Sequence, residues 1–480
     1  MNKGIFNIKA VIFMLGNFLF IESFFIGISS IVAFIYDEYD KFPLFVSALV
    51  TLIFASLFSI IGEDHDKKIR KREGYIIVSL VWVMFSLFGL LPFYISGGIS
   101  NLTDAFFETM SSFTTTGSSI LTNVEDFPHG LLFWRSLMQW LGGLGFVVLC
   151  LAIMPFIGGD FNMFSAETTG PIQDKMQPRI RETAKRLWGL YLFLTLTESL
   201  LLWLEGMDYF DAICHSLATL STGGMSTKQM SIAYWDSPFI HYTIILFMII
   251  GGTSFTLLYH SLVKQRFYKL FKNEEFKFYI LFILLATIAI TLILFFIVPE
   301  YGAKEKTIRD SLFHVTAFIT STAFSTTDYT TWPSISWLIF ILLMITGSCS
   351  GSTTGGIKIV RFILLIKNSF YEFKRRLHPN AILPIKMNNE FVSEKVINSL
   401  FAFFTIYIAA IFLSIIILSI SGTSLTDSFN ISISTISNIG IGDYASLPTF
   451  SKWYLSFLML VGRLELFTVL LLFSPALWKK

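Results

Sequence analysis

Ten apolar runs, separated by short polar segments, account for most of this chain. Each run approaches or exceeds the roughly twenty apolar residues that a helix needs to cross the hydrocarbon core of a bilayer. The pattern therefore predicts ten membrane-spanning helices. They cover residues 8–36, 43–62, 75–96, 131–155, 187–205, 238–262, 276–298, 334–366, 396–420 and 453–478.

A second pattern recurs four times between these runs. An Asp is followed, thirteen residues later, by a small residue in a Ser/Thr-rich turn, in segments 104–117, 211–224, 310–323 and 427–440. Self-similarity at one spacing indicates related structural units. We therefore predict an all-α polytopic membrane protein: four span–pore-loop–span repeats around one ion pathway, plus two extra N-terminal spans.

These repeats divide the chain into five predicted segments. They are residues 1–73 (the two N-terminal spans), 74–160 (repeat 1), 161–266 (repeat 2), 267–378 (repeat 3, with a broken eighth span) and 379–480 (repeat 4).

Composition supports the membrane assignment. The chain is 54% hydrophobic and only 14% charged, with a mean hydropathy of +0.67, whereas soluble domains carry about 25% charged residues. The net charge of +2 predicts no nucleic-acid partner, and the three cysteines form no metal-binding or disulfide motif. The first run is longer than the core of a signal peptide, so no cleavable signal is expected.

Loop charge predicts the orientation. With ten spans, the Lys/Arg clusters near residues 63–73, 175–186, 264–277, 358–376 and 479–480 all fall on one side, and the acidic segment 37–41 falls on the other. Basic loops stay in the cytoplasm. Both termini are therefore predicted to be cytoplasmic, and the four Asp-led loops to open outward.

Each Asp-led segment is long enough for a helix that crosses half the bilayer. The predicted N-caps of these helices are Asp104, Asp211, Asp310 and Asp427, since carboxylates accept the free N–H groups of a helix start. The partly negative C-terminal ends would then point at the turns and stabilise a cation there.

The four turns, which we call filter turns 1 to 4, are residues 114–117, 221–224, 320–323 and 437–440. They are small and carry no acid, and glycine permits the positive φ that lets successive carbonyls face inward. A ring of carbonyls replaces the hydration shell of a monovalent cation. The predicted ion ligands are Thr115, Thr116, Gly117, Thr222, Gly223, Gly224, Ser321, Thr322, Ala323, Asn438, Ile439 and Gly440.

The eighth span is interrupted by the Gly/Ser/Thr-rich segment 347–356. Such a sequence disfavours a stiff lipid-facing helix and predicts a flexible loop in the pathway; the alternative is a kinked helix packed through small residues. Lys358 and Arg361 would sit at the cytoplasmic mouth. Arg463, within the tenth span, is predicted to form an electrostatic barrier below the filter. The alternative for Arg463 is a structural partnership with a carboxylate or with loop carbonyls.

Four acidic residues in or near the apolar segments also need a role. Glu108 is expected to brace the filter or to attract cations, and its repeat position holds His215 and His314 elsewhere in the chain. The acids given mainly structural roles are Glu22, Glu198 and Glu205.

With these motifs the chain resembles the Trk/Ktr/HKT potassium transporters, most closely the bacterial Trk membrane subunit. The resemblance covers nearly the whole chain. It rests on the four turns and on QWLGGLG (139–145), AETTGPIQDKMQPRIRETAKRLW (166–188), GSCSGSTTGGIKIVR (347–361) and GRLELFTVLLLFSP (462–475).

The resemblance implies a gated potassium uptake pathway in the bacterial cytoplasmic membrane, potassium being the transported ion and no cofactor being covalently bound. It also implies a homodimer and a cytoplasmic ring of nucleotide-binding regulatory subunits. The implied intramembrane gate comprises Gly347, Gly351, Ser352, Thr353, Thr354, Gly355, Gly356, Lys358 and Arg463.

One position departs from the family pattern. Ala323 stands where the family usually has glycine, so turn 3 either avoids the left-handed region or carries strain of roughly 1–2 kcal/mol. Gly117 favours potassium over sodium in this family. An alternative function is a proton- or sodium-coupled potassium symporter. No enzyme is expected, because the chain has neither HExxH nor GxSxG.

Overall fold

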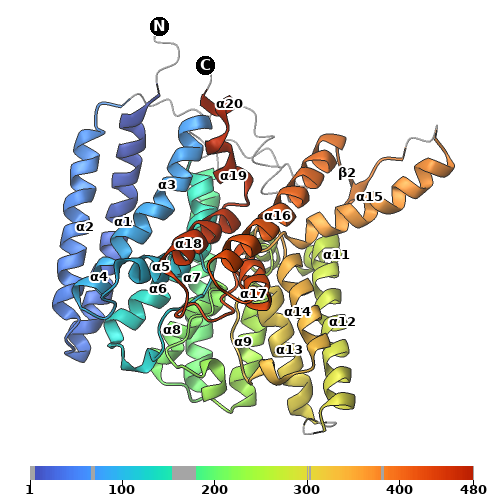
Figure 1. The fold of residues 1–480 in the computed structure, drawn as a ribbon, viewed down its shortest axis with the longest axis horizontal. Helices are drawn as coiled ribbons and strands as arrows, with labels where there is room; N and C mark the ends of the chain where they lie inside the picture. Colours follow the sequence, from blue (N-terminus) through green and yellow to red (C-terminus); the bar gives the residue numbers. More distant parts are fainter. Residues whose placement is uncertain are drawn as a thin grey trace.

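The computed structural model describes residues 6–65, 71–153, 180–299, 301, 304–379 and 383–478, and these are predominantly helical (Figure 1). The predicted all-helical character is confirmed, with one small departure. The strands β1 (Lys386–Met387) and β2 (Glu390–Phe391) form a short antiparallel hairpin between the third and fourth repeats.

The first two helices, α1 (Ile8–Tyr36) and α2 (Lys41–Ile61), form an antiparallel pair on one flank of the molecule (Figure 1). Asn7 caps α1 by accepting the Ala10 N–H at 3.1 Å. The two helices approach closely at Gly16, where a methyl group would lie within 2.9 Å of Ala55 and Ser59 atoms. Long apolar side chains on both helices are exposed, as expected for a surface that faces lipid.

A long helix, a short helix of 12 to 15 residues and an outgoing helical segment then follow one another four times. Repeat 1 contains α3 (Lys71–Gly89), α4 (Leu91–Ile95), α5 (Leu102–Phe113), η1 (Val124–Asp126) and α6 (His129–Ile153). Repeat 2 contains α7 (Ile180–Leu204), α8 (Tyr209–Leu220), η2 (Ser231–Tyr234), α9 (Pro238–Gly251), α10 (Phe255–Leu262) and α11 (Phe267–Lys272).

The second half of the chain continues the series. Repeat 3 contains α12 (Glu274–Ile297), α13 (Glu305–Ile319), η3 (Tyr329–Thr331), α14 (Ser334–Thr346) and α15 (Ile359–Leu377). Repeat 4 contains α16 (Glu394–Ile420), α17 (Leu425–Ile436), α18 (Thr449–Arg463), α19 (Phe467–Leu470), η4 (Leu471–Phe473) and α20 (Pro475–Trp478). The segment boundaries predicted above stay a prediction.

Six of the described helices are long and apolar enough to cross a membrane, and two bent helix pairs raise this number to eight. Two predicted spans are wrong as continuous helices. Segment 238–262 bends by 109° between α9 and α10, and segment 453–478 bends by 112° after α18. The second bend has a local cause, because Glu465 and Leu466 take left-handed φ values of 55° and 54° that no helix continues through.

The short helices α5, α8, α13 and α17 lie inside the molecule, surrounded by the long ones. On α5, for example, every residue from Ala105 to Phe113 is buried. By contrast, long helices such as α12 and α16 expose apolar side chains, among them Phe296 and Ile420. Buried short helices within a shell of outward-facing apolar helices are the arrangement of a multi-pass membrane protein with an internal site.

Candidate functional site

The four Asp residues do not cap the short helices, so this prediction is wrong. The caps lie three residues earlier at Asn101, Asp208 and Ser424, whose side chains accept N–H groups of the first turn, whereas α13 begins after Lys304 without a side-chain cap. The sequence pattern placed the helix starts too late because Asp is favourable throughout a first helical turn.

The four Asp side chains instead connect the short helices to other segments or to the cap. Asp211 and Asp310 each accept a hydroxyl from the Thr sixteen residues later, at 2.6 and 3.0 Å. The other two carboxylates bind Lys452 Nζ at 2.7 Å (Asp104) and the cap hydroxyl Ser424 Oγ at 2.6 Å (Asp427).

Every short helix ends in the same hydrogen-bonded turn. The second residue of each filter turn has a left-handed φ, between 53° and 57°, and its N–H donates to the carbonyl three positions earlier, as in a Schellman motif.

 The N–H of the third turn residue donates to the carbonyl five positions earlier. These bonds join Thr116 to Ser111, Gly223 to Ala218, Thr322 to Ala317 and Ile439 to Ser434, at 2.8 to 2.9 Å. The four turns therefore share one backbone geometry, as the sequence repeat predicts.

The left-handed residues at these helix ends are not glycines. They are Thr115, Thr222, Ser321 and Asn438. The sequence predicts positive φ at the glycine two residues later, and this prediction is incomplete. Gly117 and Gly224 do have φ values of 79° and 73°, so turns 1 and 2 each contain two left-handed residues.

Turn 3 has a left-handed backbone at Ala323. This residue has φ +59°, so the loop does not avoid the left-handed region and the alanine carries the strain. Turn 4 differs in another way, because Gly440 is not among the residues with positive φ, whereas Gly442 is, at 140°.

Neighbouring turns touch through their backbones. A methyl group added at Gly117 would lie 2.2 Å from Gly223 O, and one added at Gly224 would lie 1.5 Å from Thr322 O. A methyl group at Gly440 would lie 2.1 Å from the Gly117 carbonyl carbon. Turn 1 thus contacts turns 2 and 4, and turn 2 contacts turn 3, so four segments far apart in sequence are gathered at one place.

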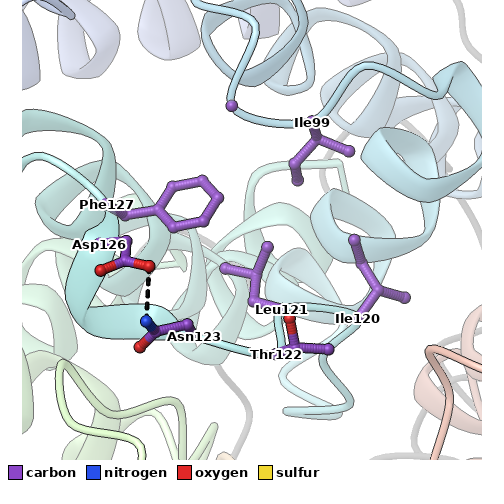
Figure 2. A pocket seen from close by; sticks show the side chains of 8 residues that line it. Ile99, Ile120, Leu121, Thr122, Asn123, Asp126 and Phe127 are labelled. Atoms are coloured by element: carbon purple, nitrogen blue, oxygen red, sulfur yellow. Dashed lines mark hydrogen bonds between the residues drawn. The ribbon is translucent and has the colours of Figure 1, made fainter.

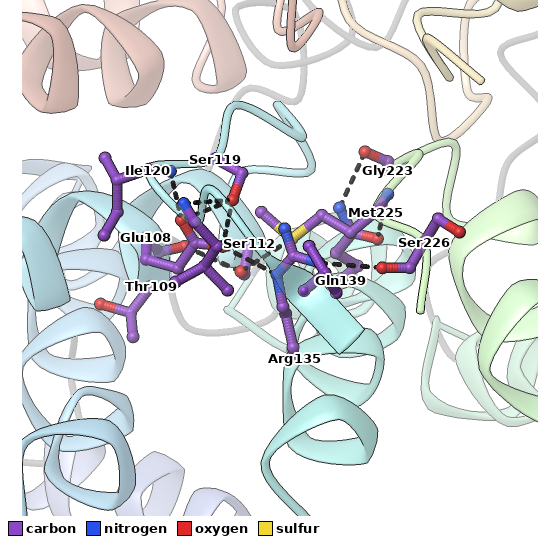
Figure 3. A network of polar contacts seen from close by, with 12 residues as sticks. Glu108, Thr109, Ser112, Ser119, Ile120, Arg135, Gln139, Gly223, Met225 and Ser226 are labelled. Carbon is purple, nitrogen blue, oxygen red and sulfur yellow. Dashed lines mark hydrogen bonds and ion pairs between the residues drawn. The ribbon is translucent and has the colours of Figure 1, made fainter. Parts of the chain in front are cut away.

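Behind turns 1 and 2 lies a buried polar network, which Figure 3 shows. The Glu108 carboxylate pairs with Arg135 Nε at 2.7 Å and accepts the Ile120 N–H at 2.9 Å. Arg135 also donates to Ser226 O at 3.1 Å. Of the two expected roles for Glu108, the contacts fit the brace, because the side chain is fully buried and its carboxylate is occupied.

The equivalent positions in repeats 2 and 3 hold histidines with a simpler role. His215 and His314 each place Nδ1 within 2.8 Å of the backbone oxygen of the Asp four residues earlier. A carbonyl only accepts, so Nδ1 carries the proton and Nε2 is an acceptor. In repeat 2 this Nε2 accepts the Ser226 hydroxyl at 2.8 Å.

The outgoing segment of each repeat meets the end of its short helix through a small residue, which lies on a helix in repeats 1, 2 and 4 and just after α14 in repeat 3. A methyl group at Gly142 would lie 1.8 Å from Phe113 O, and one at Gly462 would lie 2.3 Å from Ile436 O. A methyl group at Gly251 would lie 3.3 Å from Leu220 O, and Ser348 Oγ donates to Ile319 O at 2.8 Å. This contact relates the four repeats position by position.

The predicted interruption of the eighth span is present between α14 and α15. Residues 347–358, the gate loop, are not helical, and Gly347, Gly351, Gly356 and Lys358 have φ values from 65° to 75°. This backbone differs from the alternative of a merely kinked helix.

The gate loop contacts three filter turns. Gly355 N donates to Ser321 Oγ in turn 3 at 2.8 Å, and a methyl group at Gly355 would lie 2.1 Å from Ser437 O in turn 4. Thr353 Oγ1 lies 3.4 Å from Thr222 Oγ1 in turn 2. The loop is therefore packed directly against the turns.

Two buried cations hold the gate loop. Arg463 donates to Thr353 O at 2.6 Å and to Gly142 O at 2.7 Å, which fits the alternative of a structural partnership with loop carbonyls. Lys358 Nζ donates to the Thr354 carbonyl and lies 3.1 Å from Thr354 Oγ1. Next to them, Arg361 pairs with Glu465.

A third anchor comes from α12. The Glu275 carboxylate, which is buried, accepts the Ser350 Oγ hydroxyl at 3.0 Å and the Ser350 N–H. The adjacent Glu274 pairs with Lys367 on α15 and accepts the Asn388 N–H at 3.2 Å in the β1–β2 hairpin. The start of α12 therefore connects the gate loop to the hairpin and α15.

Two other acids on the long helices have no hydrogen-bond partner within the described part of the chain. Both carboxylate oxygens of Glu22 and of Glu198 are buried in this way. Glu205 differs, because its Oε1 accepts the Thr243 hydroxyl at 2.7 Å.

A pocket of about 290 Å³ lies beside turn 1 (Figure 2). Its lining includes Ile99, Leu121, Asn123 and Phe127, and Asp126 is the one acid among its lining residues. Asn123 donates to that carboxylate, so the acid is already engaged. The described residues also hold no cluster of three or more His, Cys, Asp or Glu that would bind a metal ion.

Comparison with known proteins agrees with the sequence resemblance. A family model for TrkH, described as a cation transport protein, matches residues 42–480. The chain is 36% identical to the Trk system potassium uptake protein TrkH of Escherichia coli K12, over 94% of this chain and 95% of that protein. It is 32% identical to the Vibrio parahaemolyticus protein of the same name, over 98% and 99%.

A solved structure matches as well. The crystal structure of the potassium transporter TrkH from Vibrio parahaemolyticus superposes with a TM-score of 0.90 at 30% sequence identity, and the match covers 99% of this chain and 100% of that one.

Several residues at the site were not found from sequence. Gln139 contacts turn 2, Glu275 contacts the gate loop and Arg135 contacts Ser226 just after turn 2, all through partners far away in the chain. The only available signal was QWLGGLG, a polar residue in an apolar run beside two glycines.

Proposed function

We propose that this chain, which belongs to the TrkH family of cation transport proteins, conducts potassium ions across a bacterial cytoplasmic membrane through a ring of its four filter turns. The observation that carries the proposal is the shared geometry of those turns. Four short buried helices end in the same Schellman-type turn, and backbone contacts join turn 1 to turn 2, turn 2 to turn 3, and turn 4 to turn 1.

This geometry suits a dehydrated monovalent cation. The C-terminal end of each short helix carries partial negative charge, and four ends placed together favour a cation between them. The turns carry carbonyl and hydroxyl oxygens without carboxylates, which is the chemistry of potassium filters. We assign the ligands to backbone carbonyls of the filter turns, drawn from the twelve predicted residues.

We propose that the gate loop closes the pathway beside the filter. It packs against turns 2, 3 and 4 and is held by Arg463, Lys358 and Glu275. A buried guanidinium next to the path also raises the electrostatic barrier for a cation. Opening then requires the loop to exchange these hydrogen bonds for others.

A homodimer is supported by an exposed apolar stripe on α15. This helix projects beyond the body of the molecule (Figure 1). Ile366, Phe370, Phe373 and Leu377 follow one face of it and are 52% to 76% exposed. Exposed stripes of this kind mark protein or membrane contacts. We propose that a second copy of the chain covers it.

We further propose that both termini are cytoplasmic and that a cytoplasmic ring of nucleotide-binding subunits regulates the gate. The first point is compatible with Figure 1, in which the start of α1 and the end of α20 lie at the same end of the molecule. The Trk relatives are named as parts of a system, which is compatible with the second.

A proton- or sodium-coupled symporter is the second candidate. The observation that favours it is the pair of buried carboxylates, Glu22 and Glu198, which have no hydrogen-bond partner among the described residues. Such groups in membrane helices are candidate proton carriers. Both lie on long helices outside the ring of turns, so permeation through the ring does not require them.

The test is ion flux in proteoliposomes that contain the purified protein. Potassium and rubidium uptake that far exceeds sodium and lithium uptake supports the filter. Uptake that depends on a proton or sodium gradient, and loses this dependence in Glu22→Gln or Glu198→Gln, supports the symporter. If no cation enters, with or without a regulatory partner, the proposed pore function is wrong.

A further inference from the structure

Helix α6 presents two buried polar side chains, one helical turn apart, to filter turns 1 and 2 (Figure 3). Arg135 is 4% exposed and Gln139 is fully buried. Burying polar groups is costly unless their hydrogen bonds are satisfied, so the partners of these side chains indicate what they do.

The Gln139 amide lies flat against turn 2. Its Nε2 donates to Gly223 O at 2.7 Å and its Oε1 accepts the Met225 N–H at 3.2 Å. A methyl group added at Gly223 would be within 2.4 to 2.7 Å of three amide atoms of Gln139. One side chain therefore holds the backbone on both sides of Gly224, which is left-handed.

The Gly223 carbonyl oxygen is turned towards its neighbours. It accepts the Gln139 amide, and it is the atom that a methyl group on Gly117 in turn 1 would strike, at 2.2 Å. A carbonyl oxygen has two lone pairs, and here the amide takes one while the contact with turn 1 crowds the oxygen, so it is less free to coordinate an ion than its neighbours. The flanking residues Thr222 and Gly224 carry the carbonyls that remain available.

The other polar pair secures the same helix. The Glu108 carboxylate on α5 accepts hydrogen bonds from Arg135 Nε and from the Ile120 N–H, which follows turn 1. Arg135 also donates to Ser226 O, which follows turn 2. Turns 1 and 2 are thus fastened to α6 and, through it, to each other.

The contact between the Gln139 amide and turn 2 is specific to repeat 1. The four repeats can be aligned on the small residue that meets the end of each short helix, namely Gly142, Gly251, Ser348 and Gly462. Three positions before it stand Gln139, Met248, Ile345 and Met459. The other three repeats therefore use an apolar side chain where repeat 1 uses an amide, so an apolar residue fits this type of position.

We propose that Gln139 is a positioning residue of the filter. Its amide fixes the Gly223 peptide so that this oxygen closes the contact between turns 1 and 2 instead of binding the ion, and this keeps the ring at the size that selects potassium over sodium. The proposal rests on the potassium filter of the proposed function and deepens it.

The test compares Gln139→Met with the wild type. Methionine has a similar length, removes both hydrogen bonds, and is the residue that the chain itself has at the equivalent position of repeats 2 and 4. Gln229→Met is the matched control, because Gln229 is exposed and contacts Val124 rather than a filter turn. Two ratios are measured: potassium over sodium flux in proteoliposomes, and the shift in melting temperature that potassium produces relative to sodium.

We expect Gln139→Met to lower the potassium-to-sodium flux ratio by about tenfold or more, the factor that one hydrogen bond of ordinary strength supplies. The potassium-specific shift in melting temperature should shrink with it, while Gln229→Met leaves both ratios unchanged. A folded Gln139→Met protein with wild-type ratios overturns the proposal.

Two further outcomes are informative. If Gln139→Met does not yield folded protein, Gln139→Asn replaces it, because asparagine keeps the amide but is too short to reach both Gly223 O and Met225 N; unchanged selectivity in that variant also overturns the proposal. A wild type that does not distinguish potassium from sodium overturns the proposed function itself, and this inference with it.

Discussion

The Arg463 guanidinium and the Thr353 carbonyl, 110 residues apart in the chain, are joined by a hydrogen bond of 2.6 Å. The same guanidinium bonds to Gly142 O and Gly143 O on α6. One side chain at the end of α18 therefore connects the gate loop to the long helix of repeat 1, and the loop cannot move away from the filter without breaking a charged hydrogen bond.

Replacing Arg463 by Gln should loosen the gate. Charged hydrogen bonds contribute about 1.5–3 kcal/mol each, so losing the one to Thr353 favours the displaced loop. We expect potassium uptake without a regulatory partner to rise several-fold, and the melting temperature in detergent to fall. Arg375→Gln, which removes an exposed pair with Glu372, is the control. Unchanged basal uptake in Arg463→Gln would contradict the gating role.

Replacing Ala323 by Gly should relieve the strain in turn 3. A left-handed alanine costs roughly 1–2 kcal/mol, and the greater freedom of glycine in the unfolded chain offsets about 0.4–1 kcal/mol of the relief. We expect a net stabilisation of up to about 1.5 kcal/mol, measured by thermal or denaturant unfolding in detergent. Ala105→Gly, inside helix α5, should destabilise the protein, and the same sign in both variants would refute the argument.

Replacing Gly224 by Ala should abolish selective uptake. The new methyl group would lie 1.5 Å from Thr322 O, so turns 2 and 3 must separate or the backbone must change conformation. We expect potassium uptake in proteoliposomes to fall to background. Gly27→Ala on α1 is the control, because nothing lies within 4 Å of a methyl group there. Normal uptake by Gly224→Ala would show that the turns are not in contact.

Two acids in the loop between α1 and α2 should affect stability with opposite signs. Burial raises the pKa of Asp40 above its ordinary value of 3.8, despite a hydrogen bond from Leu131 N, and a hydrogen bond from Lys41 lowers the pKa of Asp37. A raised pKa stabilises the fold below the unfolded pKa, and this contribution is lost as pH rises through the folded pKa. A lowered pKa stabilises the fold above the unfolded pKa and is lost as pH falls through the folded value.

Asp40→Asn should therefore gain stability relative to the wild type as pH rises from 3.8 through the raised folded pKa of Asp40, and show no gain in acid below pH 3.8. Asp37→Asn should show a loss near neutral pH that disappears in acid. The measurement is the melting temperature of each variant minus that of the wild type across roughly pH 3 to 8, a range that brackets the titration of carboxylates. Parallel pH profiles for the two variants would contradict the assignment.

Replacing Phe373 by Glu should weaken the dimer. This side chain is 69% exposed on the apolar stripe of α15, and a carboxylate there would be buried without a partner in the proposed interface. We expect a larger monomer fraction in size-exclusion chromatography with light scattering. Lys374→Glu, at the neighbouring exposed position, is the control. A dimer of unchanged strength in Phe373→Glu would place the interface elsewhere.

The long apolar helices were the most predictable part of the fold. The first predicted span, 8–36, coincides with α1 (Ile8–Tyr36), because a continuous apolar run bounded by polar residues leaves little choice. The bends after Gly251 and Arg463 were missed, since the runs stay apolar across them. The hairpin at 386–391 was missed because its strands are only two residues each.

The site was predictable where it depends on spacing and not where it depends on tertiary partners. The repeat located all four turns, yet the left-handed residues are Thr, Ser and Asn as well as Gly, because a helix C-terminus imposes that conformation on whichever residue follows. The Glu108–Arg135 pair joins residues on two different helices, and nothing local in either segment indicates the other.

The loop between α1 and α2 also reaches the start of α6, and this changes how the first two helices should be regarded. Glu38 accepts the His129 N–H at 2.6 Å, and Asp40 accepts the Leu131 N–H at 2.9 Å. Helices α1 and α2, which lie outside the four repeats, thus supply the N-terminal cap of the helix that carries Arg135 and Gln139. A shortened chain that begins after residue 41 would retain all four repeats but leave that helix end uncapped, so the additional pair helps to hold this helix in place.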